Sequence, residues 1–249
     1  MEADIRVYDT VDSTNTRLAA LAGAGAAEGT CVVAFCQTRG QGRSGRTFYS
    51  PKGGNLYMSL LLRPKDDKVF DRITVFAAVA TVKAIKAELG TACGIKWVND
   101  VIKDGKKVCG IVAKAVDHGG PCGYVILGIG INIYRDDHIP EDIAGRYGSI
   151  YDRKCDLPED EAEKEATKLA KRIISEFAYY YDGKRYDEAA EEYRDLSLVI
   201  GKCVEYMSGN STLTARVLGI DDDGGIILET DDGVRTYRDG EIRIKMNDM

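Results

Sequence analysis

Residues 38–46 read Thr-Arg-Gly-Gln-Gly-Arg-Ser-Gly-Arg and place three arginines among three glycines. Arginine offers a planar fork of donors that matches carboxylate and phosphate oxygens, and glycine lets backbone N–H groups approach an anion closely. No Gly-Lys-Ser/Thr follows, as it would in a P-loop, and the glycines do not open a helix as in a dinucleotide site. The stretch therefore indicates an anion-binding loop, with a solvated basic turn as the alternative.

The charge of the whole chain sets that loop apart. Lys and Arg total 34 against 40 Asp and Glu, which leaves a formal net charge of -6 over 249 residues. A general nucleic-acid-binding surface is expected to be basic, so this balance argues against one. The 44% hydrophobic content is sufficient for one large domain, or for a main domain with a small appendage.

Cysteine and histidine usage restricts the chemistry further. The seven cysteines form no C-x-x-C motif, and His118 and His138 lie in polar, loop-like surroundings. A zinc site or a histidine-based triad is therefore not expected, and most cysteines are expected to be reduced core residues. No signal sequence is recognised, and charges interrupt the apolar stretch 73–89, so a cytoplasmic protein without a membrane partner is expected.

Hydrophobic periodicity predicts strands on both sides of the loop and helices beyond them. The predicted strands are 7–9, 31–37, 55–63, 95–98, 101–103, 107–116 and 124–134. The predicted helices are 16–22, 71–89, 156–181 and 186–196, the first and third with caps at 12–15 and Asp156. Short strands follow at 203–207, 213–218, 226–229, 234–237 and 241–244. We expect an α+β chain, with residues 1–196 as one domain and residues 197–249 as a small β-barrel domain.

Four segments carry polar residues suited to chemistry. They are Ser13-Thr14-Asn15, the loop 37–46, Lys96 to Asp100 with Lys107 shortly after, and Gly128 to Asn132. Each is weak alone, because a Ser-Thr-Asn run usually only caps a helix and Gly-x-Gly in a strand often marks close packing. Their joint occurrence in one chain is much more specific.

In order and approximate spacing, these segments resemble the catalytic domain of biotin protein ligases. The similarity extends through Pro51, Gly54 to Ser59 and Lys107-x-x-Gly110-Ile111, while Gly219 to Asp221 and Gly240-Glu241 resemble that family's C-terminal domain. The resemblance implies a class II synthetase-like, biotin/lipoate-ligase catalytic fold, with a mixed sheet, flanking helices and an SH3-like C-terminal barrel. No helix-turn-helix pattern precedes it, so the type without a DNA-binding domain is expected, and DNA binding is not implied.

The activity implied by the resemblance uses biotin and ATP to form biotinyl-5′-AMP and pyrophosphate. A lysine of a biotin carboxyl carrier domain then attacks the mixed anhydride. Two anions must meet in the first step, so positive charge has to offset their repulsion. Arg43 and Lys107 are the catalytic candidates, with Lys107 at the junction of carboxylate and phosphate.

Biotin carries a ureido group on an apolar bicycle, so its pocket needs a few hydroxyls or amides in an apolar wall. The implied biotin-binding residues are Ser13, Thr14, Asn15, Gln37, Gly40, Gln41, Gly42, Arg43, Lys107, Gly110, Gly128 and Gly130. The implied ATP-binding residues are Arg39, Arg43, Arg46, Phe48, Tyr49, Asn99 and Asn132, and Asp100 is the candidate ligand for Mg²⁺. Core packing is an alternative role for Phe48 and Tyr49, and it is the expected role of Trp97.

An acyl adenylate hydrolyses unless water is excluded, so the loop is expected to order as a lid over the intermediate. Three positions depart from the family's common pattern: Gln41 stands where arginine is frequent, Val98 replaces a proline, and Phe48-Tyr49 replaces a tryptophan-containing pair. Gln41 is expected to weaken the hold on the adenylate. The alternatives are a lipoate-type ligase, which shares the fold and the chemistry, and a non-catalytic biotin- or anion-binding module. A homodimer is common in the family, but the sequence carries no interface signal.

Overall fold

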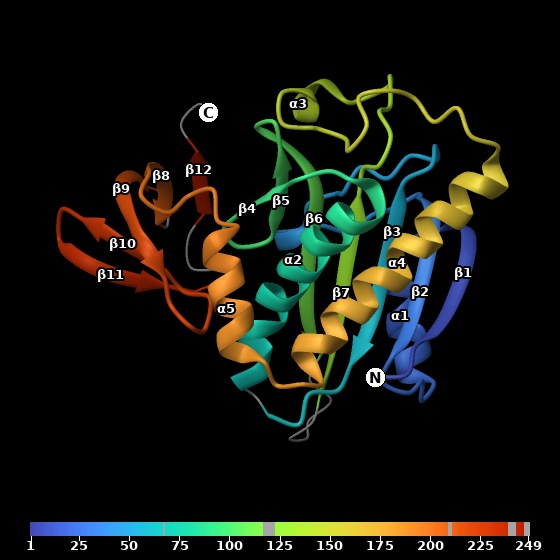
Figure 1. The fold of residues 1–249 in the computed structure, drawn as a ribbon, viewed down its shortest axis with the longest axis horizontal. Helices are drawn as coiled ribbons and strands as arrows, with labels where there is room; N and C mark the ends of the chain where they lie inside the picture. The colour runs from blue at the N-terminus through green and yellow to red at the C-terminus, as the bar shows by residue number, and fades with distance from the viewer. Residues whose placement is uncertain (67, 117–122, 209–210, 239–242, 247–249) are drawn as a thin grey trace.

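The computed structural model describes residues 1–66, 68–116, 123–208, 211–238 and 243–246, and its strands form two sheets (Figure 1). A seven-stranded mixed sheet has the order β1-β2-β3-β7-β6-β5-β4, and a five-stranded antiparallel sheet has the order β11-β10-β9-β8-β12. The predicted α+β class is therefore confirmed.

The elements follow the predicted order closely. The strands of the first sheet are β1 (Asp4–Val11), β2 (Thr30–Gln37), β3 (Leu56–Leu62), β4 (Gly94–Lys96), β5 (Asp100–Lys103), β6 (Lys106–Val116) and β7 (Tyr124–Ile131). The helices are α1 (Thr14–Gly23), α2 (Lys68–Leu89), α3 (Glu141–Ala144), α4 (Glu159–Tyr181) and α5 (Tyr186–Asp195). The second sheet consists of β8 (Cys203–Ser208), β9 (Ser211–Ile220), β10 (Ile226–Thr230), β11 (Gly233–Tyr237) and β12 (Arg243–Met246).

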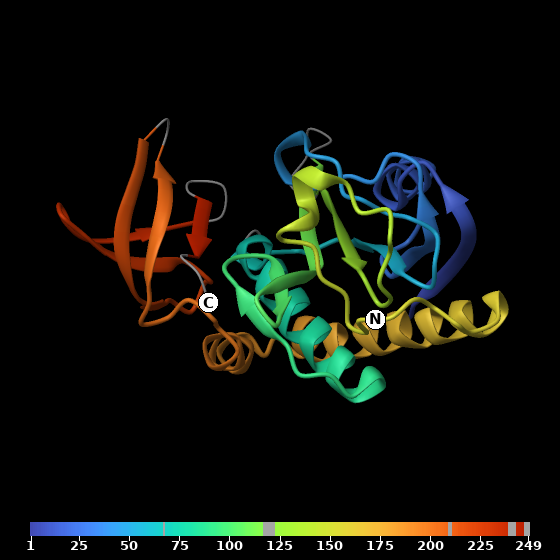
Figure 2. The same ribbon diagram turned by 90° about the horizontal axis from the view of Figure 1, so that it is seen from above.

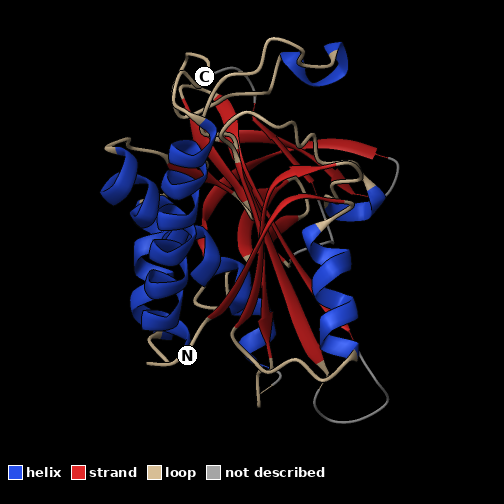
Figure 3. Cartoon of the chain, turned by 90° about the vertical axis from the view of Figure 1, so that its right-hand side faces the viewer, coloured by secondary structure: helices blue, strands red, loops and turns tan. Residues whose placement is uncertain are grey.

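The first sheet is covered by helices on both faces. β1 and β2 run parallel with α1 as their crossover, whereas the other neighbouring strands are antiparallel. Helices α2, α4 and α5 lie on one face, where α2 contacts β6 and α4 contacts β2 and β3. Helix α1 lies on the other face against β2, β3 and β7, so the strands run between two groups of helices (Figure 3).

The alternation of side chains along β7 explains where open space remains. Leu127, Ile129 and Ile131 belong to the main core cluster, in which α2 and α4 also take part. Successive strand residues point to opposite faces, so Ile126, Gly128 and Gly130 face the α1 side. Ile126 packs with Leu18 of α1 there, but the two glycines have no side chain with which to fill the space.

The second sheet lies beyond the β4 edge of the first, next to α5 (Figure 2). The chain leaves α5 by pairing briefly with β4, since Ile95 N–H donates to Leu196 O at 2.7 Å and Leu198 N–H donates to Ile95 O at 2.9 Å. All five strands of the second sheet lie after Ser197. No described helix has the length and apolar character needed to span a membrane.

Several predicted boundaries were wrong. Helix α1 begins two residues earlier than predicted, and its N-cap residue Ser13 makes no side-chain capping bond. Helix α4 begins at Glu159, because Pro158 is the N-cap residue and Asp156 instead pairs with Arg153. Strand β7 ends at Ile131, three residues before its predicted end. The sequence did not predict α3 or the 3-10 turn at Arg43–Gly45.

The cysteine prediction holds for only part of the set. Cys31 and Cys109 are buried, Cys36, Cys93 and Cys155 are half-buried, and Cys203 is exposed; all six are free. Burial, with a smaller effect of Asp4, raises the pKa of Cys31 to about 12. His118, Cys122 and the Gly240-Glu241 match lie outside the described residues.

Candidate active site

The pocket of interest opens on the α1 side of the first sheet. All four of the polar segments recognised in the sequence contribute to its lining. Its lining residues are Thr14, Asn15, Gln37, Gln41, Gly42, Arg43, Phe48, Met58, Asn99, Lys107, Gly110, Ile111, Val112, Gly128, Ile129 and Gly130.

The floor of the pocket is a pair of facing glycines on neighbouring strands. Gly110 of β6 is in register with Gly130 of β7, and the Phe48 ring lies against both. A Cβ at Gly110 would lie 2.9 Å from Phe48 Cε2, and a Cβ at Gly130 would lie 2.8 Å from Phe48 Cζ. Only glycine therefore permits this close approach of the ring to the sheet.

One wall is a network of hydroxyls and amides at the N-terminus of α1. Gln37 Oε1 accepts from Thr14 N–H at 2.8 Å and lies 3.1 Å from its hydroxyl, while Gln37 Nε2 donates to Ser50 Oγ at 2.9 Å. The Ser59 hydroxyl lies 2.7 Å from both Thr14 Oγ1 and Asn15 Oδ1. Because these polar groups position one another, the wall is preorganised for a ligand with donor and acceptor edges.

The opposite wall is cationic. Arg43 Nη1 donates to Asn99 Oδ1 at 2.9 Å, and Asn99 Nδ2 donates to Ile111 O at 2.6 Å. Lys107 Nζ lies 2.5 Å from Asp100 Oδ1 and 5.9 Å from the Phe48 ring centroid. Two adjacent residues, Asn99 and Asp100, thus hold the two predicted catalytic cations.

A third cation lies next to this pair on β4. Lys96 is the cross-strand partner of Asp100. Burial lowers the pKa of Lys96, and the nearby Lys107 lowers it further, whereas Asp100 raises it. The Asp100 carboxylate therefore interacts favourably with both lysines and partly offsets their repulsion.

Backbone and side-chain hydrogen bonds shape the arginine-glycine loop. Gly42 N–H donates to Arg46 O at 2.7 Å, Phe48 N–H donates to Gly40 O at 2.9 Å, and Gln41 Nε2 donates to Thr16 Oγ1 at 3.0 Å. Ser44 and Gly45 have positive φ angles of 54° and 72°. The turn at the tip of the loop is thus compact but exposed.

The outer side of the loop forms a second, open groove that adjoins the pocket at Arg43. Among the described residues, its lining carries four cationic side chains and no acidic one: Arg39, Arg43, Arg46 and Lys114. This local excess of positive charge contrasts with the acidic balance of the whole chain and suits a multiply charged anion.

The structure brings most of the sequence-predicted site residues into this one pocket. The outer groove is instead lined by Arg39, Gly40 and Arg46. Tyr49 turns away from the pocket, because its hydroxyl donates to His138 O at 3.0 Å and its ring packs on Tyr147. Trp97 is 6% exposed and lies in the core, as predicted.

Two further predicted residues are buried outside the pocket lining and keep unpartnered polar atoms. Ser13 Oγ and Asn132 Oδ1 have no hydrogen-bond partner among the described residues. Asn132 Nδ2 donates to Gly148 O at 2.9 Å, so only its oxygen is available as an acceptor.

The residues of the two hollows that the sequence interpretation missed include Met58, Ile111, Val112, Ile129 and Lys114. The period-2 alternation could have identified two of them, because Val112 and Lys114 share the face of Gly110 on β6. Met58 and Ile129 face the main core, so periodicity gives no signal for their place in the lining.

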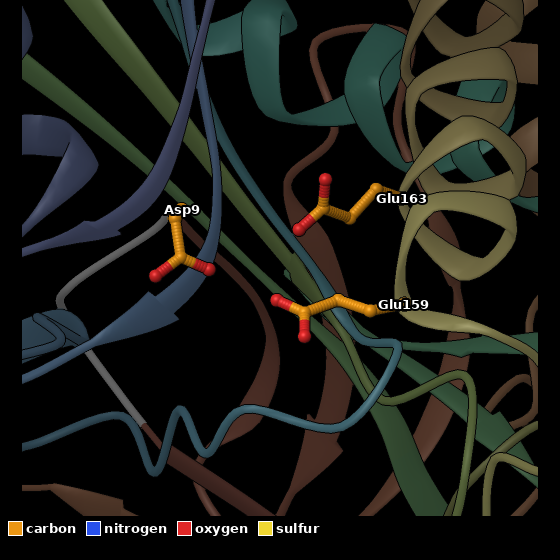
Figure 4. Close-up of side chains that lie close together, drawn as sticks. All are labelled: Asp9, Glu159 and Glu163. Atoms are coloured by element: carbon orange, nitrogen blue, oxygen red, sulfur yellow. The ribbon is translucent and has the colours of Figure 1, made fainter.

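A cluster of acidic residues lies elsewhere, where β1 approaches the start of α4 (Figure 4). Carboxylate oxygens of Asp9, Glu159 and Glu163 lie within 4.8 Å of one another. Lys52 Nζ lies 2.8 Å from Asp9 and 2.6 Å from Glu159. The lysine pairs with two of the three carboxylates, so part of the charge that would hold a cation is already offset.

Comparison with known proteins agrees with this geometry. Residues 7–132 match the biotin/lipoate A/B protein ligase family, and residues 199–244 match the biotin protein ligase C-terminal domain. The bifunctional ligase/repressor BirA of Bacillus spizizenii is 30% identical over 246 residues, which cover 95% of this chain and 72% of that protein. The biotin--[acetyl-CoA-carboxylase] ligase of Mycobacterium tuberculosis is 28% identical over 224 residues, covering 87% of this chain and 80% of that protein.

A solved structure extends the similarity to three dimensions. Biotin protein ligase from Aquifex aeolicus, in complex with biotin and ATP, aligns with a TM-score of 0.80 at 27% identity and covers 98% of this chain and 99% of that chain. By its two matched segments and its fold, the chain belongs to the biotin/lipoate A/B protein ligase family, as a biotin protein ligase.

Proposed function

We propose that the chain attaches biotin to a lysine of a biotin carboxyl carrier domain, with biotinyl-5′-AMP as the intermediate. One observation carries the proposal: Arg43 and Lys107 reach into the same pocket that ends in the Thr14 and Gln37 network. A cationic wall opposite a neutral polar wall suits a ligand with a carboxylate at one end and a neutral polar group at the other.

Biotin lies, in this proposal, with its ring system near α1 and its carboxylate near Lys107. The ureido group needs both donors and acceptors, which the hydroxyl and amide network of Thr14, Asn15 and Gln37 supplies. The apolar bicycle rests on the glycine floor beside Phe48. The Ser13 hydroxyl, buried and unpartnered among the described residues, is a further candidate for the ureido group.

Adenylation brings the biotin carboxylate to the α-phosphorus of ATP. A carboxylate oxygen forms the new bond to phosphorus while the bond to the β-phosphate oxygen breaks, so pyrophosphate leaves. Lys107 and Arg43 offset the repulsion of the two anions and stabilise charge that develops at phosphorus. Lys107 exchanges its contact with Asp100 for the substrate, which keeps its charge paired before the substrate arrives.

The nucleotide is proposed to span Asn132 and the outer groove. The unpartnered Asn132 Oδ1 is an acceptor suited to a donor such as an amino group. Arg39, Arg46 and Lys114 suit the triphosphate tail or the pyrophosphate that leaves. Tyr49 is the weakest of the predicted ATP-binding residues, because its hydroxyl and ring already have protein partners.

Mg²⁺ is proposed only as the companion of the ATP substrate. Asp100 is the predicted ligand, but Lys107 holds its carboxylate at 2.5 Å, and none of the described residues that line the pocket is acidic. The donor set does not fit a resident metal, so no step is assigned to one.

In the second step the carrier lysine attacks the acyl carbon of the adenylate, and AMP leaves with the electrons of the broken acyl–phosphate bond. The lysine must lose a proton, and Asp100 is a candidate acceptor within the site.

We further propose that the protein acts in the cytoplasm, where its free cysteines stay reduced. We also propose that the chain divides into domains at residues 1–196 and 197–249, and that it assembles as a homodimer. No DNA partner is proposed.

The test is incubation of the protein with biotin, MgATP and an apo carrier domain, followed by streptavidin detection and mass measurement of the target lysine. Parallel reactions contain lipoate, which would identify the lipoate-type alternative by its own mass increment. Biotin transfer is expected. Biotin binding by the folded protein without AMP or pyrophosphate formation would instead identify a non-catalytic module.

A further inference from the structure

The turn between β9 and β10, residues 221–225, lies against the segment that carries Asn99 and Asp100. The indole Nε1–H of Trp97 donates to Gly224 O at 2.9 Å. Trp97 is the only tryptophan of the chain and is 6% exposed. The second sheet thus reaches the active-site segment of the first through one buried hydrogen bond.

The turn is itself rigid, because one carboxylate organises it. Asp221 Oδ1 accepts from the backbone N–H of Asp223 at 3.0 Å and of Gly225 at 2.7 Å, and Arg238 Nη1 adds a contact at 2.8 Å. Gly224 has a φ of +84°, and a Cβ there would lie 2.6 Å from Val75 Cγ2 of α2. Both the backbone conformation and the close approach to α2 therefore require glycine.

Two arginines, from helices that lie on the first sheet, form ion pairs with the same turn. Arg72 of α2 contacts Asp223 Oδ1 through Nε at 2.9 Å and Nη2 at 2.6 Å. Arg194 of α5 donates to Asp222 Oδ1 at 2.9 Å and to Ile220 O at 3.3 Å. Such partly exposed pairs add little stability individually, but together they fix the position of the turn.

The residues that follow Trp97 in the chain form part of the cationic wall of the pocket. Val98 O accepts from the Tyr193 hydroxyl of α5 at 3.0 Å, so the backbone after Trp97 is fixed from a second side. The next residue, Asn99, holds Arg43 at 2.9 Å, and Asp100 holds Lys107 at 2.5 Å. A shift of Trp97 would therefore move both anchors of the catalytic cations.

We propose that the 221–225 turn of the C-terminal sheet is a positioning element for adenylation, which acts through Trp97 on the Asn99–Asp100 pair. This inference rests on the proposed function. Gly224 and Trp97 are positioning residues and do not touch substrate. Adenylation requires aligned charges, and misplacement of about 1 Å can cost roughly 100-fold in rate.

The test compares Gly224→Ala with Gly233→Ala in the full-length protein. Gly233, the first residue of β11, has a φ of +107°, but a Cβ there would meet nothing within 4 Å, so it controls for backbone strain within the same sheet. Gly224→Ala should lower kcat for biotin-dependent ATP–pyrophosphate exchange by roughly 10- to 100-fold with little change in KM for biotin. It should also shift the fluorescence emission of Trp97, while Gly233→Ala changes neither.

A second variant, Trp97→Phe, keeps an aromatic ring but removes the indole donor together with part of the ring volume. It should reproduce the loss in kcat at nearly unchanged biotin affinity. Wild-type kcat in Gly224→Ala despite shifted emission, or equal losses in Gly224→Ala and Gly233→Ala, would overturn the inference. Failure of the proposed function is distinguishable, because the wild-type protein itself would then show no exchange.

Discussion

The two sides of the candidate site are built on different principles. The floor and the α1 wall consist of strand and helix residues that position one another, such as Gly110 against Gly130 and Gln37 between Thr14 and Ser50. The arginine-glycine loop is anchored at its base, where Arg39 N–H donates to Asp12 O at 2.7 Å, but residues 44–47 at its tip are exposed. The difference indicates a preformed pocket for the organic acid and an adaptable cover for the phosphates.

The largest expected effect comes from removal of a cation at the boundary between these regions. Lys107→Ala should lower biotin-dependent ATP–pyrophosphate exchange by about 10²- to 10³-fold, as is typical when one preorganised electrostatic contact is lost. Arg43→Ala should have a similar effect. Steady-state exchange measures both, and Lys171→Ala, an exposed change on α4, is the control. Normal rates in both cation variants would contradict the assigned roles.

A change in the preformed floor should affect biotin rather than the phosphates. Gly130→Ala places a Cβ against the Phe48 ring, and such overpacking costs about 1–3 kcal/mol, so KM for biotin should rise roughly 10- to 100-fold. KM for ATP should change much less. Gly145→Ala is the matched control, because a Cβ there would meet nothing within 4 Å. Equal increases in the two KM values would contradict separate roles for the glycine floor in biotin binding and for the arginine-glycine loop in phosphate binding.

The arginine-glycine loop should become more ordered when ligands bind, whereas the floor of the pocket should not change. Trypsin cleavage after Arg39, Arg43 and Arg46 should slow several-fold when biotin and MgATP are both present, because the loop orders over the adenylate. Cleavage after Lys184, in the exposed link between α4 and α5, serves as the internal control. Unchanged cleavage within residues 38–46 would exclude the lid.

The smallest effect is expected at Gln41. Its amide bonds Thr16 at 3.0 Å in an exposed position. Gln41→Arg adds a charge at the mouth of the pocket and should slow release of biotinyl-5′-AMP by about two- to fivefold, since an exposed ionic contact contributes roughly 0.5–1 kcal/mol. Release is measured by filtration after single-turnover adenylation, with Gln41→Lys as a test of charge against hydrogen-bond geometry. Faster release from the arginine variant would contradict this role.

The sequence predicted those parts of the fold in which local pattern and tertiary environment agree. The alternating and apolar runs of β2, β3, β6 and β7 were recognised, as was the α2 periodicity. The prediction that Asp156 caps α4 failed, because its carboxylate forms an ion pair with Arg153. Pro158 is the N-cap residue instead, and the helix begins at Glu159. Local capping preference is weak wherever such a competing contact exists.

The site was predicted from residue types, but its internal division was not. Arg39 and Arg46 were placed with Arg43 in one phosphate-binding set, whereas the two of them line the outer groove and Arg43 borders both hollows. The contribution of Trp97 was also missed, because its partner Gly224 lies 127 residues away in the chain. Contacts of that separation leave no periodic signal in a single sequence.

The most direct measurement is detection of the intermediate itself. The wild-type protein is incubated with biotin and MgATP without any carrier, and the protein-bound small molecules and the released pyrophosphate are quantified by mass spectrometry and a coupled assay. We expect biotinyl-5′-AMP and pyrophosphate in equal amounts, both strongly reduced in Lys107→Ala. Biotin retained by the protein with neither adenylate nor pyrophosphate formed would contradict the ligase function.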